Sequence, residues 1–151
     1  MTLKKIAVVC YAFFSSTTLL AQELATNEQQ QVQQTVVNFF EALSNRDSIA
    51  LKKYSTANIL LLETGSIWNA DSLILKAITL NTASDFKRTN RFDFIKTTVH
   101  KNSAWVSYQL YSAITRNGKF ITAHWTETVV ATKSRTGWKI NTLHSTLIKR
   151  S

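Results

Sequence analysis

AHWTETVVATKSRTGWKINTLHSTLI, which spans Ala123 to Ile148, alternates apolar and polar side chains on both sides of a short polar segment. Such alternation is typical of half-buried strands, and the segment Lys133 to Gly137 is typical of a turn. The sequence therefore predicts a β-hairpin near the C-terminus. We expect the inward-facing side chains of this hairpin to form the surface on which the rest of the chain packs.

The register of the hairpin decides which polar groups share its apolar face. A register that gathers the apolar side chains is favoured, because a slip of one residue turns every side chain to the opposite face. It predicts that Glu127 and His144 lie together among apolar neighbours. The opposite pairs in this register are Trp138 with Ala131, Ile140 with Val129, Thr142 with Glu127, and His144 with Trp125.

Asn117-Gly118 is a second turn signal, just before this hairpin. Both residues tolerate positive φ angles, which a tight two-residue hairpin turn requires. Pairing Arg116 with Lys119 then places Tyr108 opposite Glu127. Two separate turns thus predict one face that carries Tyr108, Glu127 and His144.

The N-terminal half has a helical rather than a two-residue period. Helices are predicted from an N-cap at Asn27 through Leu43, over Ser48 to Tyr54 with Asp47 as the cap, and over Asp71 to Leu80. Strands are predicted over Asn58 to Glu63, Ile67 to Trp68, Phe92 to His100 and Ala104 to Ile114, and a polar loop over Asn81 to Asn90. Three helices followed by antiparallel strands indicate an α+β fold, with the helices packed on one face of a mostly antiparallel sheet.

Residues 1–21 differ in composition from the rest of the chain. Lys4 and Lys5 precede an apolar run that is short for a membrane span, and a small residue, Ala21, precedes a polar segment. These features predict a bacterial signal peptide that is cleaved near Ala21, and therefore a secreted or periplasmic protein without a stable membrane span after cleavage. An uncleaved anchor helix is the alternative. Residues 22–26 are predicted to be a flexible leader, and residues 27–151 a single domain.

Charge and composition argue against several classes of function. The formal net charge is +9, and +7 without the two signal-peptide lysines, but the basic residues are dispersed, so a solvated basic surface is expected and no nucleic-acid partner. The one cysteine, Cys10, lies in the predicted signal peptide, the three histidines are scattered, and three isolated glycines form no phosphate-binding loop. No metal site and no cofactor are predicted.

Several short motifs resemble a known superfamily. They are Ala104-Trp105-Val106 after a turn, Trp125 to Thr128, Gly137 to Ile140 and Leu143 to Thr146. At these spacings the chain from residue 27 to 149 resembles the SnoaL-like or nuclear-transport-factor-2-like superfamily, in particular its small secreted bacterial members. The resemblance implies a cone in which a strongly curved sheet wraps around the helices, a pocket at the wide end, and homodimers formed through the sheet.

The resemblance does not assign a particular activity to this chain. The superfamily includes ketosteroid isomerase, scytalone dehydratase, polyketide cyclases, epoxide hydrolases and non-catalytic scaffolds, and a fold with many functions does not assign one. This chain has Phe39 and Phe40 where ketosteroid isomerases place a tyrosine that holds an oxyanion. It also lacks the pair of pocket aspartates of the epoxide hydrolases.

The candidate site is the polar cluster on the apolar hairpin face. The proposed catalytic residues are Glu127 and His144, and the proposed ligand-binding residues are Tyr108, Trp125, Thr142, Trp68 and Tyr54. The leading hypothesis is a domain that binds a small hydrophobic or weakly acidic molecule. One alternative is a proton-transfer enzyme of the isomerase, dehydratase or cyclase type that uses Glu127 and His144. Another is a non-catalytic dimerisation module, and a purely structural Glu–His pair also stays open.

Overall fold

The computed structural model describes residues 26–151. The predicted signal peptide and the predicted leader, apart from Thr26, lie outside the described residues. Within 26–151 no helix is both long enough and apolar enough to cross a membrane.

The first helix, α1 (Asn27–Ser44), begins one residue later than its cap, which is Thr26. The prediction of Asn27 as the N-cap is therefore wrong by one position. The Thr26 hydroxyl accepts the Gln29 N–H at 3.3 Å, and the Gln29 side chain accepts the Thr26 N–H at 2.6 Å. This reciprocal capping box satisfies two amide groups that the first helical turn leaves without partners.

The second helix has its predicted bounds and cap, whereas the third differs from its prediction. In α2 (Ser48–Tyr54) the Asp47 carboxylate accepts the N–H groups of Ile49 and Ala50 at 3.0 and 2.9 Å, as predicted. The expected third helix is divided into α3 (Ala70–Leu73) and a π-helical turn, η1 (Ile74–Thr79). In this turn the helical hydrogen bonds reach five residues back, as between Leu80 N and Leu75 O at 2.9 Å.

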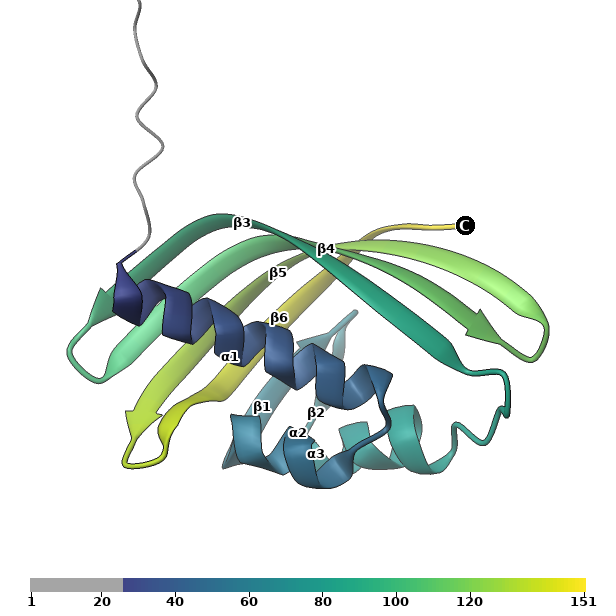
Figure 1. Ribbon diagram of the computed structural model, residues 1–151, viewed down its shortest axis with the longest axis horizontal. Helices are drawn as coiled ribbons and strands as arrows, with labels where there is room; N and C mark the ends of the chain where they lie inside the picture. Colours follow the sequence, from purple (N-terminus) through teal and green to yellow (C-terminus); the bar gives the residue numbers. More distant parts are fainter. Residues whose placement is uncertain (1–25) are drawn as a thin grey trace, which may run out of the picture.

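The strands of residues 26–151 form one sheet in the order β2-β1-β6-β5-β4-β3. They are β1 (Ser55–Glu63), β2 (Ser66–Trp68), β3 (Lys87–His100), β4 (Ser103–Arg116), β5 (Lys119–Ser134) and β6 (Gly137–Arg150). All neighbouring strands are antiparallel except β1 and β6, which are parallel. The long strands β3 to β6 arch over α1 (Figure 1). The helices α2 and α3 and the short strands β1 and β2 lie below α1 in this view. The α+β prediction, with a curved, mostly antiparallel sheet on N-terminal helices, is confirmed.

The β4–β5 hairpin has the predicted register. Arg116 pairs with Lys119 and Tyr108 pairs with Glu127. At the turn Asn117 and Gly118 have φ angles of 53° and 72°, as a tight hairpin turn of this kind requires. The Asp85 carboxylate accepts both turn N–H groups, at 2.8 and 2.6 Å, and so ties the preceding loop to the hairpin tip.

The β5–β6 register differs from the prediction. The observed pairs are Ala131 with Ile140, Val129 with Leu143, Glu127 with Ser145, and Trp125 with Leu147. The irregularity between Val130 and Ala131 leaves an extra residue in β6, and this bulge reverses which side chains face inward beyond it. The prediction that His144 shares a face with Glu127 is therefore wrong, because the residue beside Glu127 is Ser145.

The hydrophobic core fills the space between α1 and the concave face of the sheet. Val32, Val36 and Phe39 of α1 are buried, with exposed fractions of at most 1%. They face the inward side chains of β4, β5 and β6, such as Val106 and Ile140, which are also fully buried. Irregularities in β3 and β6 bend these long strands. A cavity lies beside this core and is lined by residues of both α1 and the sheet.

The outer face of the sheet carries aromatic side chains that are partly exposed, among them Trp105 and Tyr111. Trp105 and Val130 pair across β4 and β5, and their exposed fractions are 44% and 39%. Tyr111 stacks on His124, with ring centroids 4.2 Å apart. The homodimer that the family resemblance implies through this face stays a prediction.

Candidate functional site

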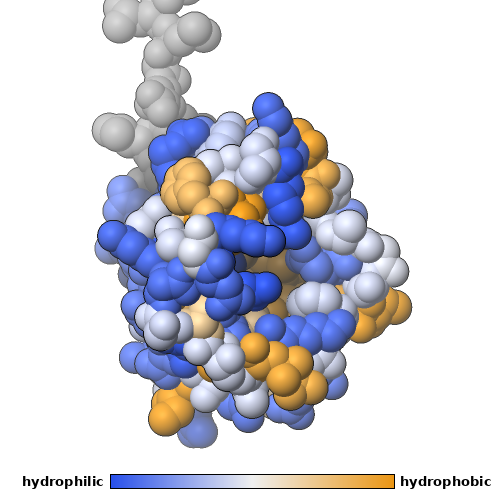
Figure 2. All heavy atoms as spheres, turned by 90° about the vertical axis from the view of Figure 1, so that its right-hand side faces the viewer, coloured by the Kyte–Doolittle hydropathy of each residue, from blue (hydrophilic) through white to orange (hydrophobic). Residues whose placement is uncertain are grey.

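The cavity has a volume of about 360 Å³ and is lined mainly by apolar side chains. Its wall combines residues from α1, β1, β2 and β5, including Phe39, Phe40, Leu43, Leu61, Trp68 and Trp125. Figure 2 shows a hollow with an apolar floor between hydrophilic side chains on the side of the molecule where the β4–β5 hairpin ends. A space of this size and lining is typical of sites for small molecules.

A row of polar side chains crosses the concave face of the sheet. Neighbouring strands align Tyr108 of β4 with Glu127 of β5, Glu127 with Ser145 of β6, and Ser145 with Glu63 of β1. Glu127 and Glu63 both line the cavity, on either side of Ser145. Neighbouring strands are about 4.8 Å apart, so two strand spacings separate the backbones of the two carboxylates by about 10 Å. Together these strands place two acidic groups on one cavity wall.

Glu127 is the central group of this row and is 3% exposed. Its Oε1 accepts the Ser145 hydroxyl at 2.8 Å, whereas Oε2 has no hydrogen-bond partner among the described residues. Burial raises the pKa of Glu127 to about 7, against the opposing effects of the Tyr108 and Ser145 hydroxyls, while the charge of Glu63 raises it further. At neutral pH this carboxyl can therefore either give or take a proton.

Tyr108 lies behind Glu127 and is fully buried. Its ring contacts those of Phe40, Phe92 and Phe94, with centroids 5.7 to 6.4 Å apart. The hydroxyl interacts with the Glu127 carboxyl electrostatically but forms no hydrogen bond of ordinary geometry. Burial first, and the neighbouring carboxylate second, raise the pKa of Tyr108 well above its usual value, so the hydroxyl keeps its proton.

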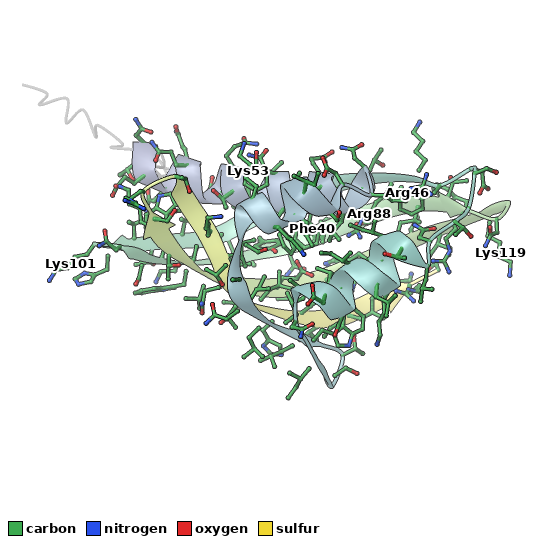
Figure 3. The ribbon with its side chains drawn as sticks, turned by 90° about the horizontal axis from the view of Figure 1, so that it is seen from below. Phe40, Arg46, Lys53, Arg88, Lys101 and Lys119 are labelled. Atoms are coloured by element: carbon green, nitrogen blue, oxygen red, sulfur yellow. The ribbon has the colours of Figure 1, made fainter. Side chains whose placement is uncertain are left out.

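Arg88 of β3 brings a positive charge to the same cavity. Its guanidinium carbon lies 5.5 Å from the centroid of the Phe40 ring and 5.8 Å from that of the Trp125 ring. Figure 3 shows Phe40 and Arg88 close together near the centre of the molecule. Burial lowers the pKa of Arg88, while the charges of Glu127 and Glu63 oppose that effect. An arginine nevertheless stays cationic at neutral pH.

A hydrogen-bond network fixes the position of this arginine. Arg88 Nε donates to Asn90 Oδ1 at 2.9 Å, and Nη2 donates to the Ser112 hydroxyl at 3.2 Å. Asn90 in turn accepts the Ser112 hydroxyl at 2.7 Å and donates to the Ser44 hydroxyl of α1 at 2.8 Å. The guanidinium is thus held between two aromatic rings by contacts from α1, β3 and β4.

The rest of the polar lining is mostly basic. Lys76, Arg116 and Arg150 line the cavity together with Arg88, and Lys76 Nζ lies 4.2 Å from the centroid of the Trp68 ring. Asn81 also lines it, and its Oδ1 is buried without a hydrogen-bond partner in the described part of the chain. Within residues 26–151, no three histidine, cysteine or acidic side chains lie close enough together to hold a metal ion.

The structure brings some of the predicted site residues together and separates others. Glu127, Trp125 and Trp68 line the cavity, with Tyr108 directly behind Glu127. Tyr54 is half-buried against the core and does not line it. Thr142 and His144 lie on the outer face because of the β6 bulge. Thr142 pairs with Val130 and His144 pairs with Thr128, and these two residues of β5 are exposed.

Sequence reasoning missed Arg88, Asn81 and Glu63 as cavity residues. Arg88 and Asn81 fell in the segment predicted to be a polar loop, but β3 already begins at Lys87. A signal for Arg88 was present, because it shares the two-residue period of Asn90 and Phe92. Extending that alternation backwards would have turned Arg88 inward.

Comparison with known proteins identifies the fold. No family model and no curated protein matches the chain. Among solved structures, a scytalone-dehydratase-like protein from Novosphingobium aromaticivorans has a TM-score of 0.73 at 8% identity, over 82% of this chain and 86% of that one. A nuclear-transport-factor-2-like protein from Salmonella enterica has a TM-score of 0.68 at 18% identity, over 79% and 89% of the two chains.

A ketosteroid-isomerase-like protein from Erwinia carotovora is also similar, with a TM-score of 0.66 at 16% identity over 83% of this chain and 99% of that one. Identities this low establish likeness of fold rather than of activity. The chain has the nuclear-transport-factor-2-like cone fold, as the sequence resemblance predicted.

Proposed function

We propose that this cone-shaped domain binds a small, largely apolar molecule in the cavity and contacts a polar atom of that molecule through Glu127. The observation that carries the proposal is Oε2 of Glu127, which forms no hydrogen bond of ordinary geometry within residues 26–151 although its carboxyl is 3% exposed and lines an apolar cavity. Buried polar atoms in native proteins are nearly always hydrogen-bonded, so an orphan atom at a cavity wall is expected to meet a ligand.

The apolar wall supports the same proposal. Phe39, Phe40 and Trp125 are buried but border a cavity, so their rings lack the packing contacts that a filled core provides on that side. An apolar molecule in this space recovers those contacts, and the polar row orients it through its oxygen or nitrogen atoms. Asn81 Oδ1 provides a second buried acceptor at the wall.

The binding test uses the neutral fluorescent probe phenylnaphthylamine. The wild-type protein is expected to bind it with a rise in probe fluorescence, and Ala77→Phe is expected to weaken binding at least about tenfold, because Ala77 lines the cavity and a phenyl ring there occupies the space. Ala57→Phe is the matched control, since Ala57 is exposed on β1 and does not line the cavity. Titration of each folded variant, checked by circular dichroism, gives the affinities.

The outcome decides the proposal in either direction. Equal binding by the wild type and both variants would place the probe outside the cavity. A wild-type protein that gives no fluorescence change at any probe concentration would also contradict a ligand-binding role. Loss of binding in Ala77→Phe alone supports it.

A second candidate function is proton transfer on the bound molecule. It is favoured by one specific observation: the pKa of Glu127 is raised to about 7, which suits a group that gives and takes a proton at neutral pH. The fold likeness to ketosteroid-isomerase-like and scytalone-dehydratase-like proteins is consistent with such chemistry. Since His144 faces outward, this candidate rests on Glu127, with Tyr108 and Arg88 as the nearest groups to oppose negative charge on a reacting oxygen.

The enzyme test follows exchange of carbon-bound hydrogen in a cyclic ketone dissolved in deuterium oxide. If Glu127 transfers protons, the wild-type protein accelerates deuterium incorporation next to the carbonyl, and Glu127→Gln reduces the acceleration by at least about a hundredfold, because an amide cannot serve as the base. Nuclear magnetic resonance measures the incorporation. Equal rates for the wild type and Glu127→Gln would remove this carboxylate from any mechanism, and the binding function alone would stand.

A further inference from the structure

Arg88 is a half-buried cation that forms no ion pair within the described residues. It lines the cavity between two aromatic rings, and none of the ion pairs within residues 26–151 includes it. Its described hydrogen bonds go to the neutral groups of Asn90 and Ser112. A charge removed from water with no opposite charge in contact is costly, and structures normally compensate it.

The two carboxylates of the cavity do not supply this compensation by contact. Glu127 and Glu63 act on Arg88 only through longer-range attraction. The donors of the guanidinium are also only partly used, since Nε and Nη2 have partners and Nη1 has none in the described residues. A planar group with free N–H donors is well suited to donate hydrogen bonds to the oxygens of a carboxylate, sulfonate or phosphate.

We propose that the molecule bound in this cavity is an amphipathic anion, whose charged oxygens lie on the Arg88 guanidinium and whose apolar body lies along the aromatic wall. The proposal rests on the binding function above and adds the chemical class of the ligand. Arg88 is then the residue that determines specificity for an anion over a neutral molecule of the same shape.

The charge of the remaining lining fits the same class of ligand. Among the described residues that line the cavity, Lys76, Arg88, Arg116 and Arg150 are basic and only Glu63 and Glu127 are acidic. Arg116 and Lys76 lie on the exposed part of this lining. A basic entrance raises the rate at which anions enter and makes that rate depend on salt concentration.

The position of Glu127 links anion binding to a proton. An anion on Arg88 repels an ionised Glu127 across the same cavity, so binding is expected to favour the protonated carboxyl, whose O–H can donate to the ligand. With the pKa of free Glu127 near 7, anion binding at neutral pH takes up part of a proton from solution. The titratable or charged groups around Glu127 are Tyr108, Glu63, Arg88, Lys76, Arg116 and Arg150.

The test compares two probes that differ by one charged group, anilinonaphthalene sulfonate and neutral phenylnaphthylamine. The wild-type protein is expected to bind the sulfonate at least about tenfold more tightly, because hydrogen bonds between charged groups are the strong ones. Arg88→Met is expected to bring the two affinities within about twofold of each other. Arg91→Met is the matched control: Arg91 lies on the outer face, paired with Asp93 and 4.0 Å from the Tyr111 ring centroid, and its loss should leave the preference unchanged.

Equal affinities in the wild type, or a preference that persists in a folded Arg88→Met variant, would overturn the proposal. Failure of both probes to bind would instead contradict the binding function on which it rests. Binding of the neutral probe alone would support the binding function and contradict the proposal that the ligand is an anion.

A second measurement tests the proposal without an arginine variant, and it can be made even if Arg88→Met does not fold. Calorimetry of sulfonate binding to the wild type at about pH 7, in buffers of different ionisation enthalpy, is expected to show proton uptake. The uptake should be absent for phenylnaphthylamine and absent in Glu127→Gln. Sulfonate binding without proton uptake would show that the anion does not lie beside Glu127 and would overturn the proposed site.

Discussion

The Glu127→Gln variant is expected to become more stable relative to the wild type as the pH rises, reaching a gain of about 3 kcal/mol at about pH 8. Burial raises the pKa of Glu127 from 4.5 to about 7 in the folded protein. Because the folded state binds this proton more tightly than the unfolded state, the stability contributed by the carboxyl is complete below about pH 4.5 and is lost by about pH 7. Glutamine does not titrate, so the variant avoids this loss.

Urea denaturation of both proteins across this pH range measures the difference. The prediction concerns how the difference between the two free energies of unfolding changes with pH. Altering the Ser145 hydrogen bond adds a cost that does not depend on pH, so this cost does not affect the predicted change. Glu63→Gln is the control for removing a carboxylate from the same cavity, because Glu63 also lines it but is only half-buried. A difference that stays constant from about pH 4 to about pH 8 would mean that Glu127 is as well solvated as a surface carboxyl.

Phe40→Ala is expected to lower the free energy of unfolding by about 3–5 kcal/mol, the range found when a buried aromatic side chain is truncated. Phe40 is 5% exposed and contacts three aromatic rings, those of Phe39, Phe92 and Tyr108, at centroid distances of 5.6 to 6.4 Å. It also packs on Arg88. Because it already borders a cavity, its removal enlarges an existing void, which the surrounding residues cannot close without moving α1.

Phe120→Ala serves as the matched control for this loss. Phe120 follows the β4–β5 turn with an exposed fraction of 69%, so the same substitution is expected to change the free energy of unfolding by less than about 0.5 kcal/mol. Chemical denaturation of both variants gives the comparison. Similar stabilities for the two variants would indicate that the aromatic cluster around Phe40 contributes little to the folded state.

The sequence correctly predicted the fold. It also predicted one wall of the site, because a local turn determines the geometry of that wall. Asn117-Gly118 fixes the register of β4 and β5, and that register alone places Tyr108 opposite Glu127. Asp47 likewise caps α2 through side-chain oxygens that lie next to the amides they accept. Predictions of this kind succeed because the deciding contacts lie only a few residues apart.

The site residues that the sequence misplaced depend on features without a local signature. Thr142 and His144 were placed by uninterrupted alternation, and a single extra residue in β6 sends both to the outer face. The approach of Glu63 to Ser145 requires parallel pairing of β1 with β6, whose paired residues lie more than eighty positions apart in the chain. Neither the bulge nor this pairing changes the apolar and polar pattern of the strands themselves.

That parallel pairing has a consequence for how the protein is made. In the sheet order β6 lies between β1 and β5, so the strand synthesised first pairs with one that is synthesised after β2, β3, β4 and β5. Contacts between distant parts of a chain form slowly, because a long loop must close first. Ser145, which lies between Glu63 and Glu127, can join them only when β6 takes its place between its neighbours. The cavity wall of a nascent chain therefore stays incomplete until β6 has been synthesised, and termination before β6 removes the strand that lies between the two carboxylates.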